Sequence, residues 1–267
     1  MSVTISLDGK AAIVVGAGQT EGATLGNGRA TALLLASAGA RVLAADRNLA
    51  SAEETVRLIE SEGGKAFAVK VDVTAEDDIA AMAARCLEEW GRIDILHNNV
   101  GITIGDAPVT DIDAGVLARL LATNLGSMVL AAKHVLPTMR RQGSGVITNI
   151  SSNAATIDYP NVGYKTSKSA IVALTEHLAI RNAEFGIRAN AILPGLMDTP
   201  MAVERRINAE RTREQVLADR RARVPLRGRS GNAWDVAHAA VFLASDAAAF
   251  ITGTALLVDG GHSLRVG

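Results

Sequence analysis

Short apolar segments alternate along this chain with longer segments whose apolar residues recur at helical spacing. Parallel strands buried under helices on both faces are apolar throughout, so the short runs predict such strands. The runs cover residues 11–15, 41–45, 66–71, 93–97, 145–150, 188–193 and 255–258, and the helical segments cover 28–38, 51–62, 75–90, 113–141 and 164–184. The alternation predicts an α/β fold, a doubly wound sheet of seven mainly parallel strands with helices on both faces.

The 267 residues contain no Pro/Ser-rich linker, composition shift or internal repeat, which predicts one domain over residues 1–267. The alternation pauses only over residues 197–231. Between Met201 and Arg229, nine arginines stand against four acids. An inserted helical segment after a strand end is typical of a substrate lid. Two interpretations of these arginines are open. Either they lie on a solvated helix pair, or one or two of them turn inward and bind an anionic group of the substrate.

Charge and cysteine content restrict the partners and the compartment. With 27 basic and 28 acidic residues, the chain lacks the basic excess that nucleic acid or anionic lipid attracts. The single cysteine, Cys86, cannot form an internal disulfide and is expected to be a reduced core thiol. We find no export signal over residues 1–10 and no uninterrupted apolar stretch long enough to span a membrane. These features predict a cytoplasmic protein without nucleic-acid or membrane partners.

A glycine-rich turn follows the first predicted strand and opens a helix, with Gly16, Gly26 and Gly28 as its marker positions. Glycines let the backbone approach a pyrophosphate, and the helix N-terminus offers free N–H groups. The next strand ends at Asp46, whose carboxylate can bind both ribose hydroxyls of an adenosine. The same charge repels a 2′-phosphate, which favours NAD over NADP, although the neighbouring Arg47 retains some affinity for phosphate.

Two further groups predict proton-transfer chemistry. The spacing of Tyr164 and Lys168 places a phenol and an ammonium one helical turn apart. A nearby cation favours the phenolate, so the pKa of Tyr164 is expected to fall toward neutrality. Ser151 and Ser152 close the predicted strand 145–150, where hydroxyls face the crevice that binds ligands in such sheets.

Together these residues resemble the short-chain dehydrogenase/reductase family in its shorter single-domain branch. The resemblance runs from about residue 7 to residue 261. It also includes Asp72-Val73, His97-Asn-Asn-Val-Gly101, Asn124, Pro194-Gly195 and Val258-Asp-Gly-Gly261, in that order along the chain. The joint occurrence of these short motifs is far more specific than any one of them, and it implies a Rossmann fold and a nicotinamide cofactor.

The resemblance also implies a role for each matching position. Tyr164 is the general acid/base, Lys168 binds the nicotinamide ribose, and Ser152 binds the substrate oxygen. Asn124 holds a water that links Lys168 to solvent. For the cofactor, it implies Asp72 and Val73 at the adenine, Asn98 and Gly101 near the adenosine ribose, and Pro194, Gly195 and Thr199 at the nicotinamide carboxamide. No residue is assigned as a metal ligand.

The chain departs from the family pattern in two places. Nine residues separate Gly16 from Gly26, an insertion of six in the family's Gly-x3-Gly-x-Gly loop, so residues 18–25 are expected to bulge over the pyrophosphate. Counting back from Tyr164 as in the family selects Ser151, whereas the strand-end motif selects Ser152. We choose Ser152, because a one-residue loop deletion costs less than inverting the faces of a strand.

These features predict an NAD-dependent oxidoreductase that interconverts a secondary alcohol and a ketone by hydride transfer. The substrate is expected to be a small molecule, hydroxylated or anionic. One alternative is an inactive dinucleotide-binding regulator or redox sensor of the same fold. Another is an enoyl reductase, although the family's enoyl reductases have a longer Tyr-to-Lys spacing. The family resemblance, together with Ala and Leu on several faces of the helices at 113–141 and 164–184, predicts a homotetramer.

Overall fold

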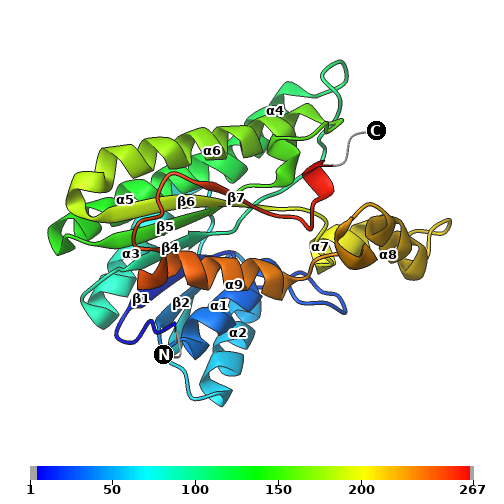
Figure 1. Ribbon diagram of the computed structural model, residues 1–267. Coiled ribbons are helices and arrows are strands. Elements are labelled where there is room, and N and C mark those ends of the chain that lie inside the picture. Colours follow the sequence, from blue (N-terminus) through cyan, green and yellow to red (C-terminus); the bar gives the residue numbers. More distant parts are fainter. Residues whose placement is uncertain (1–4, 265–267) are drawn as a thin grey trace.

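One seven-stranded sheet crosses the protein in the computed structural model, which describes residues 5–264 (Figure 1). The strand order is β3-β2-β1-β4-β5-β6-β7, and every neighbouring pair is parallel. The strands are β1 (Ala11–Val15), β2 (Arg41–Asp46), β3 (Ala66–Lys70), β4 (Ile95–Asn98), β5 (Gly145–Ile150), β6 (Ile187–Pro194) and β7 (Ala255–Val258). The doubly wound sheet predicted from the sequence is confirmed.

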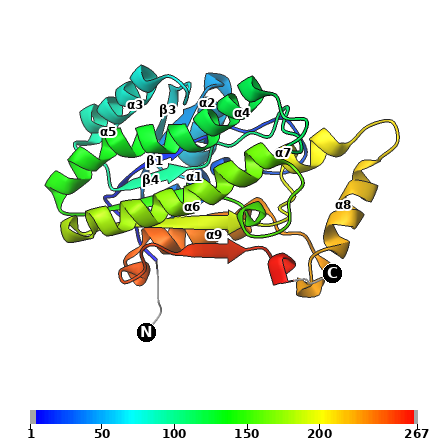
Figure 2. The same ribbon diagram turned by 90° about the horizontal axis from the view of Figure 1, so that it is seen from above.

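Helices cover both faces of this sheet (Figures 1 and 2). On one face lie α1 (Asn27–Ser37), α2 (Leu49–Ser61) and α9 (Ala233–Ala244). On the other face lie α3 (Glu76–Trp90), α5 (Ser127–Gln142) and α6 (Val162–Asn182). In β1, Ile13 packs toward the second group of helices and Val14 toward the first, so both faces of the strand are buried. This double burial explains why the strands are apolar throughout.

The strand order reverses between β1 and β4, which are neighbours in the sheet. The connections from these two strands run to opposite sides, so a crevice opens above their carboxyl ends. Ligands of open parallel sheets bind in this crevice. The fold therefore directs the ends of β1, β2, β4, β5 and β6 toward one place.

Several helical segments differ from the sequence prediction. Residues 113–141 form α4 (Ala114–Leu121), a π-helical turn (Ala122–Gly126) and α5 rather than one regular helix. Helix α9 was not predicted. It begins with a capping box in which the side chains of Asn232 and Asp235 each bind the other residue's backbone N–H.

The segment 197–231 projects from the body of the protein (Figure 2). It contains α7 (Pro200–Val203) and α8 (Arg213–Ala222), so its predicted helical character is observed. Residues 1–4, part of the segment from which we expected no export signal, lie outside the described residues.

Candidate active site

A cleft of about 750 Å³ lies at the carboxyl edge of the sheet. Nearly all of the predicted site residues line it: Gly16, Gly26, Gly28, Asp46, Arg47, Asp72, Val73, Gly101, Ser152, Tyr164, Lys168, Pro194, Gly195 and Thr199. Asn98 and Asn124 do not line the cleft in the part of the chain that the structure describes. The fold thus gathers residues that are up to 183 positions apart, from Gly16 to Thr199, around one space.

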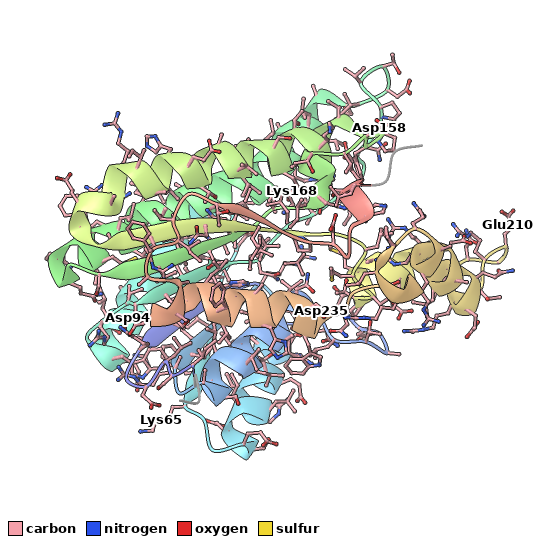
Figure 3. All side chains as sticks on the ribbon, in the orientation of Figure 1. Lys65, Asp94, Asp158, Lys168, Glu210 and Asp235 are labelled. Atoms are coloured by element: carbon pink, nitrogen blue, oxygen red, sulfur yellow. The ribbon has the colours of Figure 1, made fainter. Side chains whose placement is uncertain are left out.

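Helix α6 presents Tyr164 and Lys168 to this cleft. The Lys168 Nζ lies 5.5 Å from the centre of the Tyr164 ring and donates a hydrogen bond to the carbonyl oxygen of Ile150 at 2.8 Å. The Lys168 side chain is buried, and Figure 3 labels it near helix α6. The Ser152 side chain is near enough to the Tyr164 phenol to lower its pKa. The phenol, the ammonium and the serine hydroxyl therefore converge.

Burial dominates the protonation of this pair. It raises the pKa of Tyr164 to about 12, and the interaction with the Ser152 side chain opposes that rise. Burial also lowers the pKa of Lys168 to about 7. Our expectation that Lys168 brings the Tyr164 pKa toward neutrality is wrong for this structure, because the loss of solvation on burial is the largest effect on that pKa. Tyr164 is therefore a protonated phenol at neutral pH, ready to donate.

The two candidate serines have different partners. The Ser152 side chain acts on the pKa of the Tyr164 phenol, and its Oγ accepts the N–H of Ala154 at 3.1 Å. The Ser151 hydroxyl donates to the backbone carbonyl of Lys168 at 2.7 Å. Ser152 is thus the serine that the structure places beside the phenol.

The two predicted asparagines make structural contacts. The Asn98 amide donates to Asn149 Oδ1 on the neighbouring strand at 2.9 Å, so this buried side chain faces the sheet and not the cleft. We correct its predicted cofactor contact on this ground. Instead the next residue, Asn99, lines the cleft and donates to the carbonyl oxygen of Gly16 at 3.1 Å. The doubled asparagine was a signal for this residue, but the sequence did not tell which one leaves the strand.

Asn124 lies in the π-helical turn and is fully buried. Its Oδ1 accepts the N–H of Ile102 at 2.7 Å, and its Nδ2 donates to the Ile102 carbonyl and to Ser167 Oγ, both at 3.0 Å. Single π turns inside helices are often found at functional sites. Here the turn attaches the loop that follows β4 to helix α6, near Lys168.

The glycine turn fits a pyrophosphate. A Cβ atom at Gly28 would lie 1.9 Å from the carbonyl oxygen of Gly16, and Gly16 has a φ of +84°, which favours glycine. Helix α1 begins beside the cleft with no side-chain cap at Gly26 and no acid in its first turn. The Oδ1 of Asn27, which also lines the cleft, is buried without a partner among the described residues. The free backbone N–H groups of this uncapped helix N-terminus suit a phosphate.

Asp46 is fixed at the end of β2 by two backbone amides. Its Oδ2 accepts the N–H of Gly18 and its Oδ1 accepts that of Asn48, both at 3.0 Å. A Cβ at Gly18 would lie 2.7 Å from Asp46 Oδ2. The carboxylate is thus held at the cleft, where Arg47 is also present.

The inserted loop, residues 18–25, joins the glycine turn to the projecting segment. Gln19 anchors it, because its N–H donates to Ser51 Oγ at 2.7 Å and its Oε1 accepts the N–H of Gly26 at 2.9 Å. At the tip, a Cβ on Gly22 would lie 2.9 Å from both Pro200 and Glu204. The loop therefore covers one side of the cleft and contacts segment 197–231 there.

Most described arginines of segment 197–231 have local partners. Arg213 pairs with Glu204 at 2.7 Å, Arg220 with Asp198 at 3.1 Å, Arg229 with Asp235 at 3.2 Å and Arg211 with Asp219. Arg206 differs, since its guanidinium donates to the Ala202 carbonyl. Burial raises the pKa of both Tyr159 and Tyr164, and the charge of Arg206 partly opposes that rise. The side chains of Arg205 and Arg227 lie outside the described set.

Comparison with known proteins gives the relatives of this chain. Residues 22–263 match the family model described as "Enoyl-(Acyl carrier protein) reductase". Cis-4-hydroxycyclohexanecarboxylate dehydrogenase of Sinomonas cyclohexanicum is 38% identical over 91% of this chain and 94% of its own. A short-chain dehydrogenase/reductase structure from Burkholderia xenovorans has a TM-score of 0.89 and 38% identity, covering 98% of this chain and 99% of its own. A 7α-hydroxysteroid dehydrogenase complexed with NADH and 7-oxo glycochenodeoxycholic acid has a TM-score of 0.88 and 34% identity. The match covers 99% of this chain and 98% of that chain.

Proposed function

Since this chain belongs to the short-chain dehydrogenase/reductase family and interconverts an alcohol and a ketone by hydride transfer, we propose that it prefers NAD over NADP and acts on a small anionic or polyhydroxylated substrate. The observation that carries the proposal is the convergence of Ser152, Tyr164 and Lys168 beside a glycine turn that suits a pyrophosphate. The roles of the individual residues are part of the proposal.

The proton steps follow from the contacts of Tyr164. In the reducing direction its phenol donates a proton to the carbonyl oxygen, while Ser152 binds the same oxygen and orients it. In the oxidising direction Tyr164 must first lose its proton; the phenolate then accepts the hydroxyl proton, and the Lys168 ammonium stabilises the phenolate charge. When bound, the nicotinamide supplies or accepts the hydride. Asn124, attached to the same helix, would hold the water that links Lys168 to solvent.

The preference for NAD is supported by Asp46. Two backbone amides hold its carboxylate at the end of β2, at the position where an adenosine ribose is bound in this fold. A 2′-phosphate placed there would meet a negative charge. Around the rest of the cleft, Gly16, Gly26 and Gly28 would hold the pyrophosphate, Asp72, Val73 and Gly101 the adenosine, and Pro194, Gly195 and Thr199 the carboxamide.

The substrate class is supported by segment 197–231, which we treat as a substrate lid. Met201 and Ala202 line the cleft together with Tyr164, and Arg206 is hydrogen-bonded to Ala202. Within the described part of the lid, the Arg206 guanidinium forms no ion pair, and its charge acts on the Tyr164 phenol. A guanidinium binds a carboxylate or sulfonate well. A relative that acts on a hydroxycyclohexanecarboxylate is consistent with such a substrate.

Assembly as a homotetramer is supported by apolar surface left uncovered. The stretch Ala114–Gln142 is long and apolar enough for a membrane span by length and composition, and 33% of its apolar window is buried. It nevertheless packs on the sheet through Ala131, Val135 and Met139. The side chain of Ile180 on the outer face of α6 is 75% exposed. Helices α5 and α6 thus offer a surface to further copies, in a single-domain enzyme that we place in the cytoplasm.

The test is a screen of secondary alcohols, polyols and hydroxy acids with NAD and with NADP, followed by nicotinamide absorbance. We expect NAD-dependent turnover of at least one class. It should collapse to a small residual rate in Tyr164→Phe, which keeps the ring but removes the proton donor. Cofactor binding should survive that change. Binding of cofactor without turnover of any alcohol or ketone would favour the regulator. Turnover of an enoyl thioester instead of ketones would favour an enoyl reductase.

A further inference from the structure

Helix α6 carries both Tyr164 and Lys168, yet its own residues do not cap it. Asn161 at the N-cap position makes no side-chain capping hydrogen bond, and the first turn contains no acidic residue. Amides in the first turn of a helix have no intrahelical partner and need another acceptor. Because Tyr164 is the third residue of α6, its own backbone N–H is one of these amides.

Two residues from a distant loop accept these hydrogen bonds. The Oδ1 of Asp106 accepts the N–H of Gly163 and its Oδ2 accepts that of Tyr164, both at 2.8 Å. The Ala107 carbonyl accepts the N–H of Val162 at 3.0 Å. A carboxylate is favoured at a helix N-terminus by the partial positive charge there. Asp106 therefore caps the helix from outside and holds the backbone of Tyr164 directly.

The sequence of α6 is adapted to this contact at Gly163. A Cβ atom at that position would lie 2.8 Å from Asp106 Oδ1 and 2.5 Å from Leu120 Cδ1. Any side chain there would move the carboxylate or the leucine. Glycine is otherwise unfavourable inside a helix, so its presence before Tyr164 is explained by the approach of Asp106.

The loop that carries Asp106 is held at its other end by side chains of α4 and of the π-helical turn that follows it. Asn124 binds both the N–H and the carbonyl of Ile102, at 2.7 and 3.0 Å. Arg119 donates to the carbonyl of Ile104 at 3.0 Å. Ile102 also lines the cleft. Residues 101–107 thus form a strap, fixed at both ends, that runs from the wall of the cleft to the start of α6.

We propose that Asp106 is a positioning residue that fixes the Tyr164 phenol relative to Ser152 by holding the backbone of Tyr164. The inference rests on the acid/base role proposed above for Tyr164. A displacement of about 1 Å at a reacting group can lower a rate about a hundredfold. Asp106 itself does not need to touch the substrate for this effect.

The experiment compares Asp106→Ala and Asp106→Asn with a matched control, Asp113→Ala. Asp113 caps α4 in the ordinary way, accepting the N–H of Val116 at 2.9 Å, and it does not line the cleft in the described structure. For each variant we would measure kcat, KM, NADH affinity by fluorescence and the urea midpoint. We expect kcat to fall about tenfold to a hundredfold in Asp106→Ala, with NADH affinity nearly unchanged. Asp106→Asn retains one hydrogen-bond acceptor, so its kcat should lie between those of Asp106→Ala and the wild type. Asp113→Ala should lose stability but keep its kcat.

A double-mutant cycle shows whether Asp106 acts through the phenol. In the Tyr164→Phe background, Asp106→Ala should lower the residual rate no further, because the group that it positions is gone. Two results would overturn the inference. One is a wild-type kcat per NADH-binding site in Asp106→Ala. The other is that Asp106→Ala lowers the rate by the same factor in the Tyr164→Phe background as in the wild type. If Asp106→Ala does not fold, Asp106→Asn decides by the same criteria. Wild-type turnover in Tyr164→Phe alone would instead refute the proposed function.

Discussion

The hydroxyl of Ser151 donates a hydrogen bond to the backbone carbonyl of Lys168 across 2.7 Å. Ser151 therefore ties the end of β5 to helix α6, while the side chain of its neighbour Ser152 acts on the Tyr164 phenol. Adjacent residues at the end of one strand thus have separate tasks. Ser151 contacts the helix, and Ser152 is the residue that we propose to meet the reacting group.

Substitution of these two serines should separate the tasks. We expect Ser152→Ala to lower kcat/KM about a hundredfold or more, since it removes a hydrogen bond to the developing charge on the substrate oxygen. Ser151→Ala should cost mainly stability, about 1 kcal/mol for one buried hydrogen bond. Steady-state kinetics and urea unfolding of both variants provide the check. A larger kinetic loss in Ser151→Ala would contradict the assignment.

Cofactor preference should depend on Asp46. The wild type is expected to show a kcat/KM with NAD well above that with NADP, and Asp46→Ser should narrow the ratio by removing charge repulsion of the 2′-phosphate. Asp72→Ser is the matched control, because Asp72 lines the same edge of the cleft and its carboxylate is expected at the adenine. The Asp72→Ser variant should change kcat/KM with NAD and with NADP by about the same factor. Equal use of both cofactors by the wild type would refute the prediction.

The sequence predicted the sheet and the composition of the site well, because both depend on local pattern. Double burial makes strands such as β1 apolar throughout, and glycines at 16 and 28 are needed where a Cβ would clash. Contacts that depend on the exact residue at which a strand ends were harder to predict from the sequence. Asn98 and Asn99 are indistinguishable in sequence, and only the end of β4 determines that Asn99 meets the cleft.

Burial and distant contacts were the features that the sequence did not reveal. The spacing of Tyr164 and Lys168 correctly predicted a shared face, but their pKa values depend on desolvation by the whole fold. The π turn at Asn124 has nearly the same apolar spacing as an α-helix. Asp106 lies 58 residues before Tyr164, so no local pattern links them.

Lys168 should make the stability of the protein depend on pH. Its pKa falls from 10.5 to about 7 on folding, so between these values the unfolded chain binds more protons than the folded one. Stability then rises with pH through that range. Lys168→Met should therefore gain most over the wild type at or below pH 7, and the gain should shrink toward pH 10. Urea midpoints of both proteins from pH 6 to 10 test this, and a constant difference would contradict it.

The lid arginines should differ in their effect on charged substrates. Arg206 is the described lid cation whose charge acts on Tyr164, whereas Arg211 is paired with Asp219. A hydrogen bond to a charged group is worth about 1.5 to 3 kcal/mol, so we expect Arg206→Ala to raise the KM of an anionic hydroxy substrate about tenfold to a hundredfold. The KM of neutral alcohols should not change in Arg206→Ala, and Arg211→Ala should change the KM of neither class of substrate. The wild-type KM for the anion should also rise with ionic strength, because salt screens the attraction. If Arg206→Ala treats charged and neutral alcohols alike, the lid arginines form only a solvated surface.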